Sequence, residues 1–216
     1  MHRNGCRRSI AVVIALVSLL AGAPRGAPAL DLDALANGTS FSAGVLTFSN
    51  FDIVLGGDLP TSLDAYPVQV LADGFRIAGP LSTLLGASGS MLLSYDVSTS
   101  EPSGILGASL FSDGIALGAG AQAYVAESIF ADDGTPLGSL FVYDVAGVGG
   151  SSLDAFALGG AASLHVVGSL DLRSGTFAAL PFVEQRFVAV PEPLSMLLLL
   201  GGLAGLARAG RRPREN

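Results

Sequence analysis

The segment Leu46-Thr47-Phe48-Ser49-Asn50-Phe51-Asp52-Ile53-Val54 alternates large apolar residues with small or polar ones. Because successive side chains of a strand point to opposite faces, this pattern predicts a β-strand with one face in a core and the other in water. Downstream, residues 68–71 and 75–77 flank Asp73-Gly74, a dipeptide typical of a tight hairpin turn. Together these features predict an antiparallel β-sheet.

The same pattern continues through the middle of the chain. Further predicted strands are residues 92–97, 105–111, 123–130, 140–145, 163–172 and 182–190. Turn-forming runs separate them, among them Asp113-Gly114, Asp132-Asp133-Gly134-Thr135-Pro136 and Arg173-Ser174-Gly175-Thr176. A spacing of roughly ten residues between turns favours an all-β fold, an antiparallel β-sandwich or a jelly roll. Residues 29–39 show no clear pattern and are predicted to be a lead-in segment.

The N-terminus has the features of an export signal. Arg3, Arg7 and Arg8 precede an apolar run over residues 10–20 that only Ser18 interrupts. Small residues at Ala27 and Ala29 predict signal-peptidase cleavage after Ala29, so residues 1–29 would be a signal peptide. The alternative is an uncleaved anchor, but so short an apolar run is poorly suited to crossing a bilayer.

The C-terminus carries a second sorting pattern. Pro191-Glu192-Pro193 is followed by an apolar segment over residues 194–207. Four arginines then close the chain: Arg208, Arg211, Arg212 and Arg214. The apolar segment predicts a short transmembrane helix of about 21 Å, and the arginines favour the cytoplasm. An ordinary membrane anchor that happens to follow two prolines is the alternative interpretation.

Residues 191–216 resemble the C-terminal sorting signal of PEP-CTERM proteins, exported proteins of Gram-negative bacteria. The resemblance implies that an exosortase, a membrane protease-transpeptidase, recognises Pro191, Glu192 and Pro193 and acts at or near them. It also implies an extracellular matrix or biofilm built with exopolysaccharide as the destination. The inner membrane would hold the chain only as an intermediate, before release or attachment at the outer surface.

The charge distribution supports this topology and restricts the partners. Residues 30–190 contain sixteen acids but only Arg76, Arg173 and Arg186 as cations, a net charge of −13. Both cationic ends favour the cytoplasm, so the acidic middle, residues 30–190, is predicted to be one extracytoplasmic domain. Nucleic-acid binding is excluded because no basic patch exists to neutralise phosphates. Anionic polysaccharide would need bridging cations, whereas neutral sugar or mineral surfaces remain compatible.

The sequence shows no catalytic constellation. His165 is the only histidine of residues 30–190, and the only cysteine, Cys6, lies in the signal. Strand alternation places His165 on one face with Ser163 and Val167, as a structural or surface residue. No Gly-x-Ser-x-Gly elbow or phosphate-binding loop is present, and no cofactor is expected.

Metal binding has one weak candidate. Asp132 and Asp133 crowd two carboxylates into one loop, and calcium prefers such oxygen-rich loops. The loop lacks the spacing and the closing glutamate of an EF-hand, which favours an acidic hairpin turn without a metal.

Aromatic residues are few. Of the four tyrosines, Tyr95 and Tyr143 occupy nearly identical local sequences, Ser-Tyr-Asp-Val and Val-Tyr-Asp-Val. Four tyrosines without tryptophan are a small supply for a sugar-stacking platform, and most of the eleven phenylalanines are predicted to fill the core.

Three functions are compatible with these features of the sequence. The first is an exported structural or interaction protein of the cell surface or matrix, without enzymatic activity. The second is a secreted carbohydrate-active hydrolase that uses two carboxylates on neighbouring strands. The third is a sugar- or calcium-dependent binding module. The missing catalytic groups favour the first.

Overall fold

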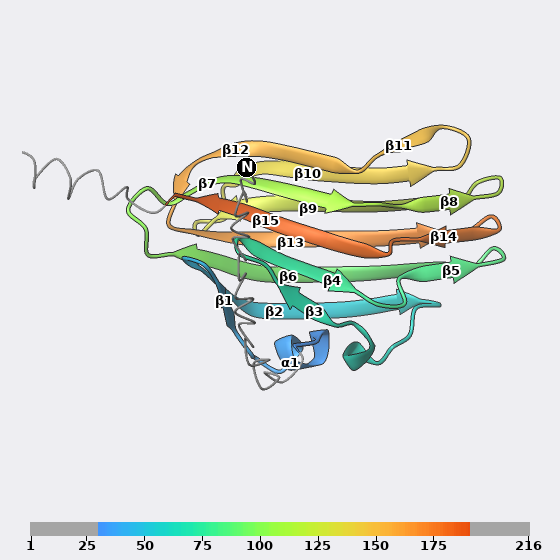
Figure 1. Cartoon of the computed structure of the whole chain (residues 1–216), viewed down its shortest axis with the longest axis horizontal. Helices are drawn as coiled ribbons and strands as arrows, with labels where there is room; N and C mark the ends of the chain where they lie inside the picture. Colours follow the sequence, from blue (N-terminus) through green and yellow to red (C-terminus); the bar gives the residue numbers. More distant parts are fainter. Residues whose placement is uncertain (1–29, 191–216) are drawn as a thin grey trace, which may run out of the picture.

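The computed structural model describes residues 30–190 (Figure 1). One sheet has seven strands in the order β1 (Phe41–Ala43), β2 (Leu46–Gly57), β6 (Ser88–Thr99), β13 (Ser163–Arg173), β9 (Gln122–Ala131), β10 (Pro136–Val145) and β11 (Gly149–Ser151). A second has five strands in the order β12 (Leu153–Ala161), β7 (Ile105–Ser112), β15 (Phe182–Ala189), β4 (Gly74–Ala78) and β3 (Val68–Val70).

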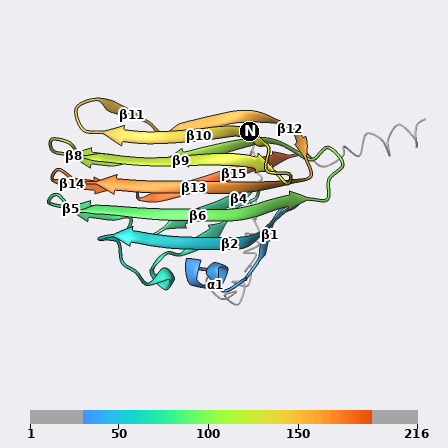
Figure 2. The same ribbon diagram turned by 180° about the vertical axis from the view of Figure 1, so that it is seen from behind.

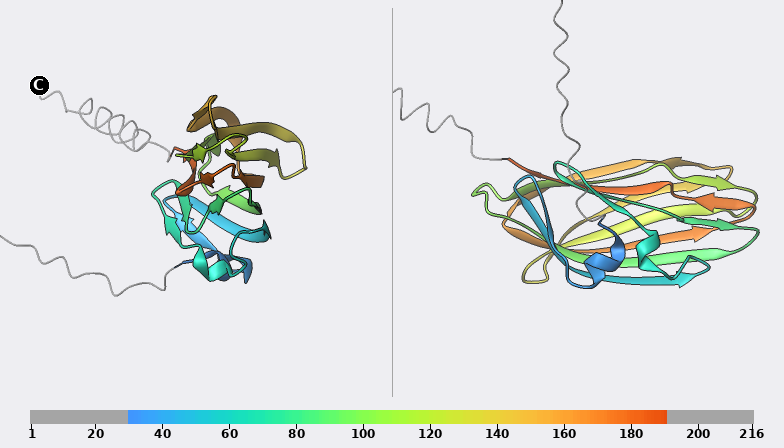
Figure 3. Two further views of the ribbon diagram at one scale, coloured as in Figure 1. Left: turned by 90° about the vertical axis from the view of Figure 1, so that its right-hand side faces the viewer. Right: turned by 60° about the horizontal axis from the view of Figure 1, so that its bottom comes forward.

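The seven-stranded and five-stranded sheets pack face to face, and every strand pairing is antiparallel, so the predicted all-β sandwich is confirmed (Figures 1 and 3). The eight main strands lie in the orders β4-β15-β7-β12 and β6-β13-β9-β10. Numbered along the chain, these orders are 1-8-3-6 and 2-7-4-5, which is the connectivity of a jelly roll.

A small third sheet closes one end of the sandwich. Its strands are β5 (Ser82–Leu84), β14 (Phe177–Ala179) and β8 (Ile115–Leu117), in that order. Each of them interrupts a connection between the two large sheets: β4 to β6, β13 to β15, and β7 to β9. The short strands were not predicted, because three residues are too few to show an alternating pattern.

The core lies between the large sheets and has an aromatic centre. Phe48 on β2 has no exposed surface, and its ring centroid lies 5.0 Å from Phe41 and 5.4 Å from Phe75. Tyr95 and Phe187 complete the contacts of this ring at 6.2 and 5.9 Å. Aromatic pairs at such separations stabilise a core beyond the area that they bury.

The phenylalanines divide between the core and the surface. Six lie in the core or pack against it: Phe41, Phe48, Phe51, Phe75, Phe156 and Phe187. The other five are at least partly exposed: Phe111, Phe130, Phe141, Phe177 and Phe182. The prediction that most of them fill the core is therefore correct by a narrow margin.

The lead-in segment contains a helix that the sequence analysis missed. In α1 (Leu32–Ala36), Leu32 and Leu35 are completely buried, and the Asp31 carboxylate accepts a hydrogen bond from the N–H of Ala34 at 2.8 Å. Asp31 is thus an N-cap, and the two leucines on one face attach the helix to the core. A single 3₁₀ turn, Leu63–Ala65, follows later in the chain.

The terminal segments lie outside the described residues. This concerns the signal-cleavage residues Ala27 and Ala29, the Pro191-Glu192-Pro193 motif, the apolar segment and the four closing arginines. Within residues 30–190, no helix is long and apolar enough to cross a membrane.

Candidate functional site

An aromatic cluster lies on the outer face of the seven-stranded sheet, the face seen in Figure 2. Tyr143 on β10 pairs directly with Tyr124 on β9, and Phe141 lies on the same face of β10. The Phe141 ring centroid is 5.9 Å from that of Tyr124 and 5.4 Å from that of Tyr143. Phe141 remains 46% exposed, so the cluster presents ring surface to solvent.

The strand register extends this cluster into a row across the sheet. Residues in the row are, in order of pairing, Gly56, Ser90, Asp171, Tyr124, Tyr143 and Ser151. Six strands at about 4.8 Å spacing make the row about 24 Å long. A linear ligand lying across the strands would meet both tyrosines.

A polar depression of about 240 Å³ adjoins the cluster and shares Tyr124 with it. Its lining includes the Gln122 amide, the Asp171 carboxylate and Arg173, together with Ser88 and Ser90. These groups supply both donors and acceptors, as hydroxyl-rich ligands require. Burial raises the pKa of Tyr124, and the charge of Asp171 and its hydrogen bond with the phenol raise it further. The hydrogen bond with Asp171 also orients the Tyr124 side chain.

A second polar depression of about 220 Å³ has Tyr143 among its lining residues. Asp113 and Asp144 both line it, along with several serines. Asp144 is already engaged, because its Oδ2 accepts a hydrogen bond of 2.7 Å from the N–H of Ala116. Asp144 pairs with the buried Ala123 and so lies on the opposite face of β10 from Phe141 and Tyr143, which means that this depression does not extend the cluster on the outer face.

Asp132 and Asp133 lie in the β9–β10 turn, at the opposite end of β9 from Gln122 and Tyr124. The Asp133 carboxylate accepts the N–H of Thr135 at 2.9 Å, and this bond lowers the pKa of Asp133. Asp132 accepts a hydrogen bond from the Ser163 hydroxyl instead. The two carboxylates thus accept hydrogen bonds from different groups. Residues 30–190 contain no group of three or more potential metal ligands.

His165 occupies the outer face of β13, as strand alternation predicted. Its Nδ1 lies 2.7 Å from Oδ1 of Asp96, whose other oxygen accepts a hydrogen bond from Asn50. The described residues place no serine or threonine hydroxyl in hydrogen-bond contact with this imidazole. The pair therefore lacks the nucleophile that a hydrolytic triad needs.

Two of the three arginines of residues 30–190 form ion pairs on the outer face of the five-stranded sheet. Arg76 Nε donates to Glu184 at 2.9 Å, and Arg186 Nε donates to the same carboxylate at 2.6 Å. Burial alone would raise the pKa of Glu184, but the hydrogen bonds from both arginines lower it. Arg173, in the 240 Å³ depression, is thus the arginine placed to contact a ligand of the aromatic cluster.

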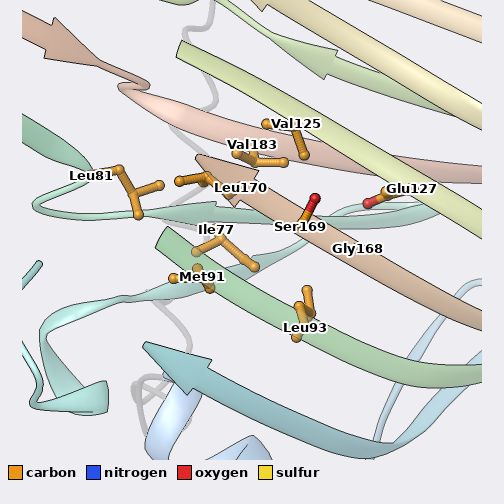
Figure 4. A pocket seen from close by; sticks show the side chains of 10 residues that line it. All are labelled: Ile77, Leu81, Met91, Leu93, Val125, Glu127, Gly168, Ser169, Leu170 and Val183. Carbon is orange, nitrogen blue, oxygen red and sulfur yellow. The ribbon is translucent and has the colours of Figure 1, made fainter. Parts of the chain in front are cut away.

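A buried carboxyl group lies between the two large sheets. Glu127 on β9 points between the sheets into a cavity of about 20 Å³ whose other lining side chains are mostly aliphatic (Figure 4). Its Oε2 has no hydrogen-bond partner among the described residues, and burial raises the pKa of Glu127 to about 8. Because the cavity has room for only about one water molecule, it is not a site for an organic ligand.

Sequence reasoning missed the aromatic cluster. Tyr66 and Tyr95 are completely buried, so only Tyr124 and Tyr143 are available for a surface cluster. Their contact depends on the register between β9 and β10. The available signal was the outward position of Tyr124 and Tyr143 in two strands that a short turn connects, which predicts an antiparallel pair.

No protein-family model matches the chain, and no curated protein matches it. Among solved structures, TmCBM61 in complex with beta-1,4-galactotriose is 15% identical, with 62% of this chain and 88% of that chain covered and a TM-score of 0.36. The enzymatically active domain of bacteriophage CBA120 tailspike protein 4 is 13% identical, with 68% and 20% covered and a TM-score of 0.28.

The Gap123 glycosylation-associated protein complex of Streptococcus agalactiae is 12% identical, with 67% of this chain and 49% of that chain covered and a TM-score of 0.27. The chain thus spans a fifth of the tailspike domain and about half of the Gap123 chain. With all three TM-scores below 0.5, these similarities carry no weight in assigning a function.

Proposed function

We propose that the protein is an exported, non-enzymatic interaction protein that binds an uncharged polysaccharide on the outer face of its seven-stranded sheet. The observation that carries this proposal is the cluster of Tyr124, Phe141 and Tyr143 beside a polar depression. Aromatic faces pack against the apolar faces of sugar rings, while the amide, carboxylate and guanidinium groups nearby satisfy hydroxyls. Recognition sites commonly combine such apolar surface with a few polar groups.

The charge of the body selects the class of polysaccharide. Residues 30–190 carry a net charge of −13, and Arg76 and Arg186 are occupied by Glu184. Only Arg173 lines the depression, beside Asp171, so the site has no excess of positive charge. A neutral chain is accommodated without electrostatic cost, whereas an anionic chain would be repelled.

The binding test uses affinity electrophoresis in gels that contain neutral galactan, glucan or mannan, with alginate as the anionic comparison. We expect retardation in at least one neutral gel and none in alginate. Tyr124→Ala should weaken the interaction about fivefold, since loss of one aromatic contact removes on the order of 1 kcal/mol. Tyr124→Phe keeps the ring and should retain most of the binding.

Phe130→Ala is the matched control, because Phe130 lies on the same face of the same strand at its other end. Equal loss with Phe130→Ala and Tyr124→Ala, or no retardation in any neutral gel, would contradict the proposed site. Release of reducing ends that Asp113→Asn and Asp144→Asn abolish would favour the hydrolase instead, because those two carboxylates line one depression.

We further propose that this body reaches the cell surface or the biofilm matrix through its two terminal signals. Supporting this are the N-terminal signal pattern, the acidic charge of residues 30–190 and the resemblance of residues 191–216 to an exosortase substrate. The described body ends directly before the motif: β15 stops at Ala189, and the carbonyl of Val190 accepts a hydrogen bond from Ser103 at 2.8 Å. The partners in this pathway are a signal peptidase and an exosortase-like enzyme.

Intact-mass spectrometry of the exported protein tests the processing. We expect a mature chain that begins at Leu30 and ends within or near Pro191-Glu192-Pro193, with or without an attached glycan or lipid. Replacement of the three motif residues by alanine should leave the tail uncleaved in the membrane fraction. An extracellular species that still carries Arg211 and Arg212 would contradict the prediction.

A further inference from the structure

The three-stranded sheet at the end of the sandwich is built from segments without any charge. The connections that form it are residues 80–88, 114–121 and 174–181, and none contains an acid, an arginine or a histidine. Sixteen acids occur elsewhere in residues 30–190. The three strands therefore carry no charge of their own, although Asp144 of β10 accepts a hydrogen bond from the N–H of Ala116 on β8.

Large apolar side chains form a row on the outer face of this sheet. Phe177 on β14 pairs with Leu84 on one side and with Leu117 on the other. Leu84 is 60% exposed and Leu117 is 53% exposed, with Ile115 next to them at 41%. The opposite face is buried against the seven-stranded sheet through small side chains, Thr83, Ala116 and Ala178. The row consequently has solvent on its outer side.

The hairpin tip beside this row holds a leucine in a strained and exposed position. Leu85 is 83% exposed and has a φ of 52°, in the left-handed region that residues other than glycine rarely adopt. Its N–H donates to the carbonyl of Thr176 at 3.0 Å, and the N–H of Gly86 donates to Ser174 Oγ at 3.0 Å. These bonds fix the conformation of the hairpin tip, and in this conformation the Leu85 side chain is exposed to solvent.

We infer that two copies of this chain associate face to face through Leu84, Leu85, Leu117 and Phe177 of their three-stranded sheets. Strain and exposure at one apolar residue indicate a function that compensates the cost. A second copy is the occupant that the charges favour. A basic partner would find no acid in this face, and an anionic lipid surface would find no lysine or arginine. Two acidic bodies, by contrast, can meet here without opposing their charges.

The strand order makes the row complementary to itself. Because β5 and β8 flank β14 symmetrically, a two-fold axis parallel to β14 would place Leu84 over the partner's Leu117 and Phe177 over the partner's Phe177. Such isologous contacts are the commonest form of association between identical chains. The fixed hairpin tip reduces the entropy lost on contact.

The end of the described chain lies away from this face. β15 begins at Phe182, beside the three-stranded sheet, and runs to Ala189 at the other end of the sandwich (Figures 1 and 3). Residues 191–216 therefore start at the far end from the proposed contact. With the two-fold axis along β14, the C-terminal ends of both copies would lie at the same end of the dimer, away from the contact.

Sedimentation equilibrium of the purified exported protein, over a range of concentrations, tests this inference. We expect a reversible monomer–dimer equilibrium that Leu84→Ser with Leu117→Ser weakens at least tenfold. Leu85→Asn should weaken the dimer as well, yet leave the thermal stability of the monomer unchanged or slightly raised, since asparagine tolerates a positive φ. A purely structural role for Leu85 would not produce these opposite signs.

Val54→Ser with Leu92→Ser is the matched control, because these residues are 54% and 53% exposed on the outer face of the seven-stranded sheet. It should leave the dimer intact. A monomer at all concentrations, or a dimer that is insensitive to Leu84, Leu85 and Leu117, would overturn the inference. Binding of the wild-type protein to phosphatidylcholine vesicles that Leu85→Asn abolishes, without self-association, would assign the face to lipid instead.

Discussion

Glu127→Gln should stabilise the protein by several kcal/mol at pH 8 and by very little at pH 4.5. Burial raises the pKa of Glu127 to about 8 in the folded protein, whereas the exposed carboxyl of the unfolded chain titrates near 4.5. The glutamine has nearly the same shape, fits the same space beside Gly168 on β13, and never ionises.

The sign of the effect follows from proton binding. Below about pH 4.5 both states keep the Glu127 proton, so its burial costs nothing that depends on pH. Between about 4.5 and 8 the unfolded state has lost the proton and the folded state retains it, so stability falls as pH rises. The slope is at most about 1.4 kcal/mol per pH unit, and the total is on the order of 3–5 kcal/mol.

Urea denaturation of the wild type and of Glu127→Gln at pH 4.5, 6 and 8 measures this difference directly. Asp52→Asn is the control for loss of one negative charge, since Asp52 is exposed on the outer face of the same sheet. It should change the stability by less than about 0.5 kcal/mol at each pH. Parallel pH profiles for the wild type and Glu127→Gln would show that Glu127 ionises normally, in contradiction to its burial.

Phe48→Ala should destabilise the fold by about 3–5 kcal/mol, whereas Phe141→Ala should cost less than about 1 kcal/mol. Phe48 has no exposed surface and contacts four other aromatic rings, so its removal leaves a cavity between the sheets. Phe141 is 46% exposed, and its loss removes only contacts at the surface.

Only Phe141→Ala should change polysaccharide binding. Phe141→Ala removes the central ring of the aromatic cluster and should weaken retardation in neutral gels about tenfold. Phe48→Ala, tested well below its melting temperature, should bind as the wild type does. Thermal unfolding and affinity electrophoresis of the same samples measure both effects. If Phe141→Ala unfolded as readily as Phe48→Ala, the assignment of these rings to surface and core would be wrong.

Much of the fold could be predicted because strand alternation is a local property. All nine segments predicted to be strands are strands, and the Asp73-Gly74 turn does join an antiparallel pair. His165 faces outward between the completely buried or nearly buried Leu164 and Val166, as expected. The helix α1 was missed because its signal is only Asp31 followed by two leucines, too short for a periodicity to emerge.

The candidate site could not be predicted in the same way. Tyr95 and Tyr143 occur in almost the same tetrapeptide, yet Tyr95 is completely buried and Tyr143 lies on the outer face. Local sequence defines which residues share a face of a strand, but not which face meets the core. Glu127 shows the same limit, because a glutamate within an alternating strand is expected on the solvent side and here it points inward.

The sequence was sufficient to establish that this protein has an acidic body without lysine, rich in antiparallel β-strands, between two apolar ends that carry arginines. It was sufficient because charge is read from composition and strand alternation is read from neighbouring residues. Only the tertiary structure brought Tyr124 opposite Tyr143 and gathered Leu84, Phe177 and Leu117, which lie up to 93 residues apart, into one row. Strand order and register decide such contacts. They depend on how two complete sheets bury their faces together, and no single segment carries that information.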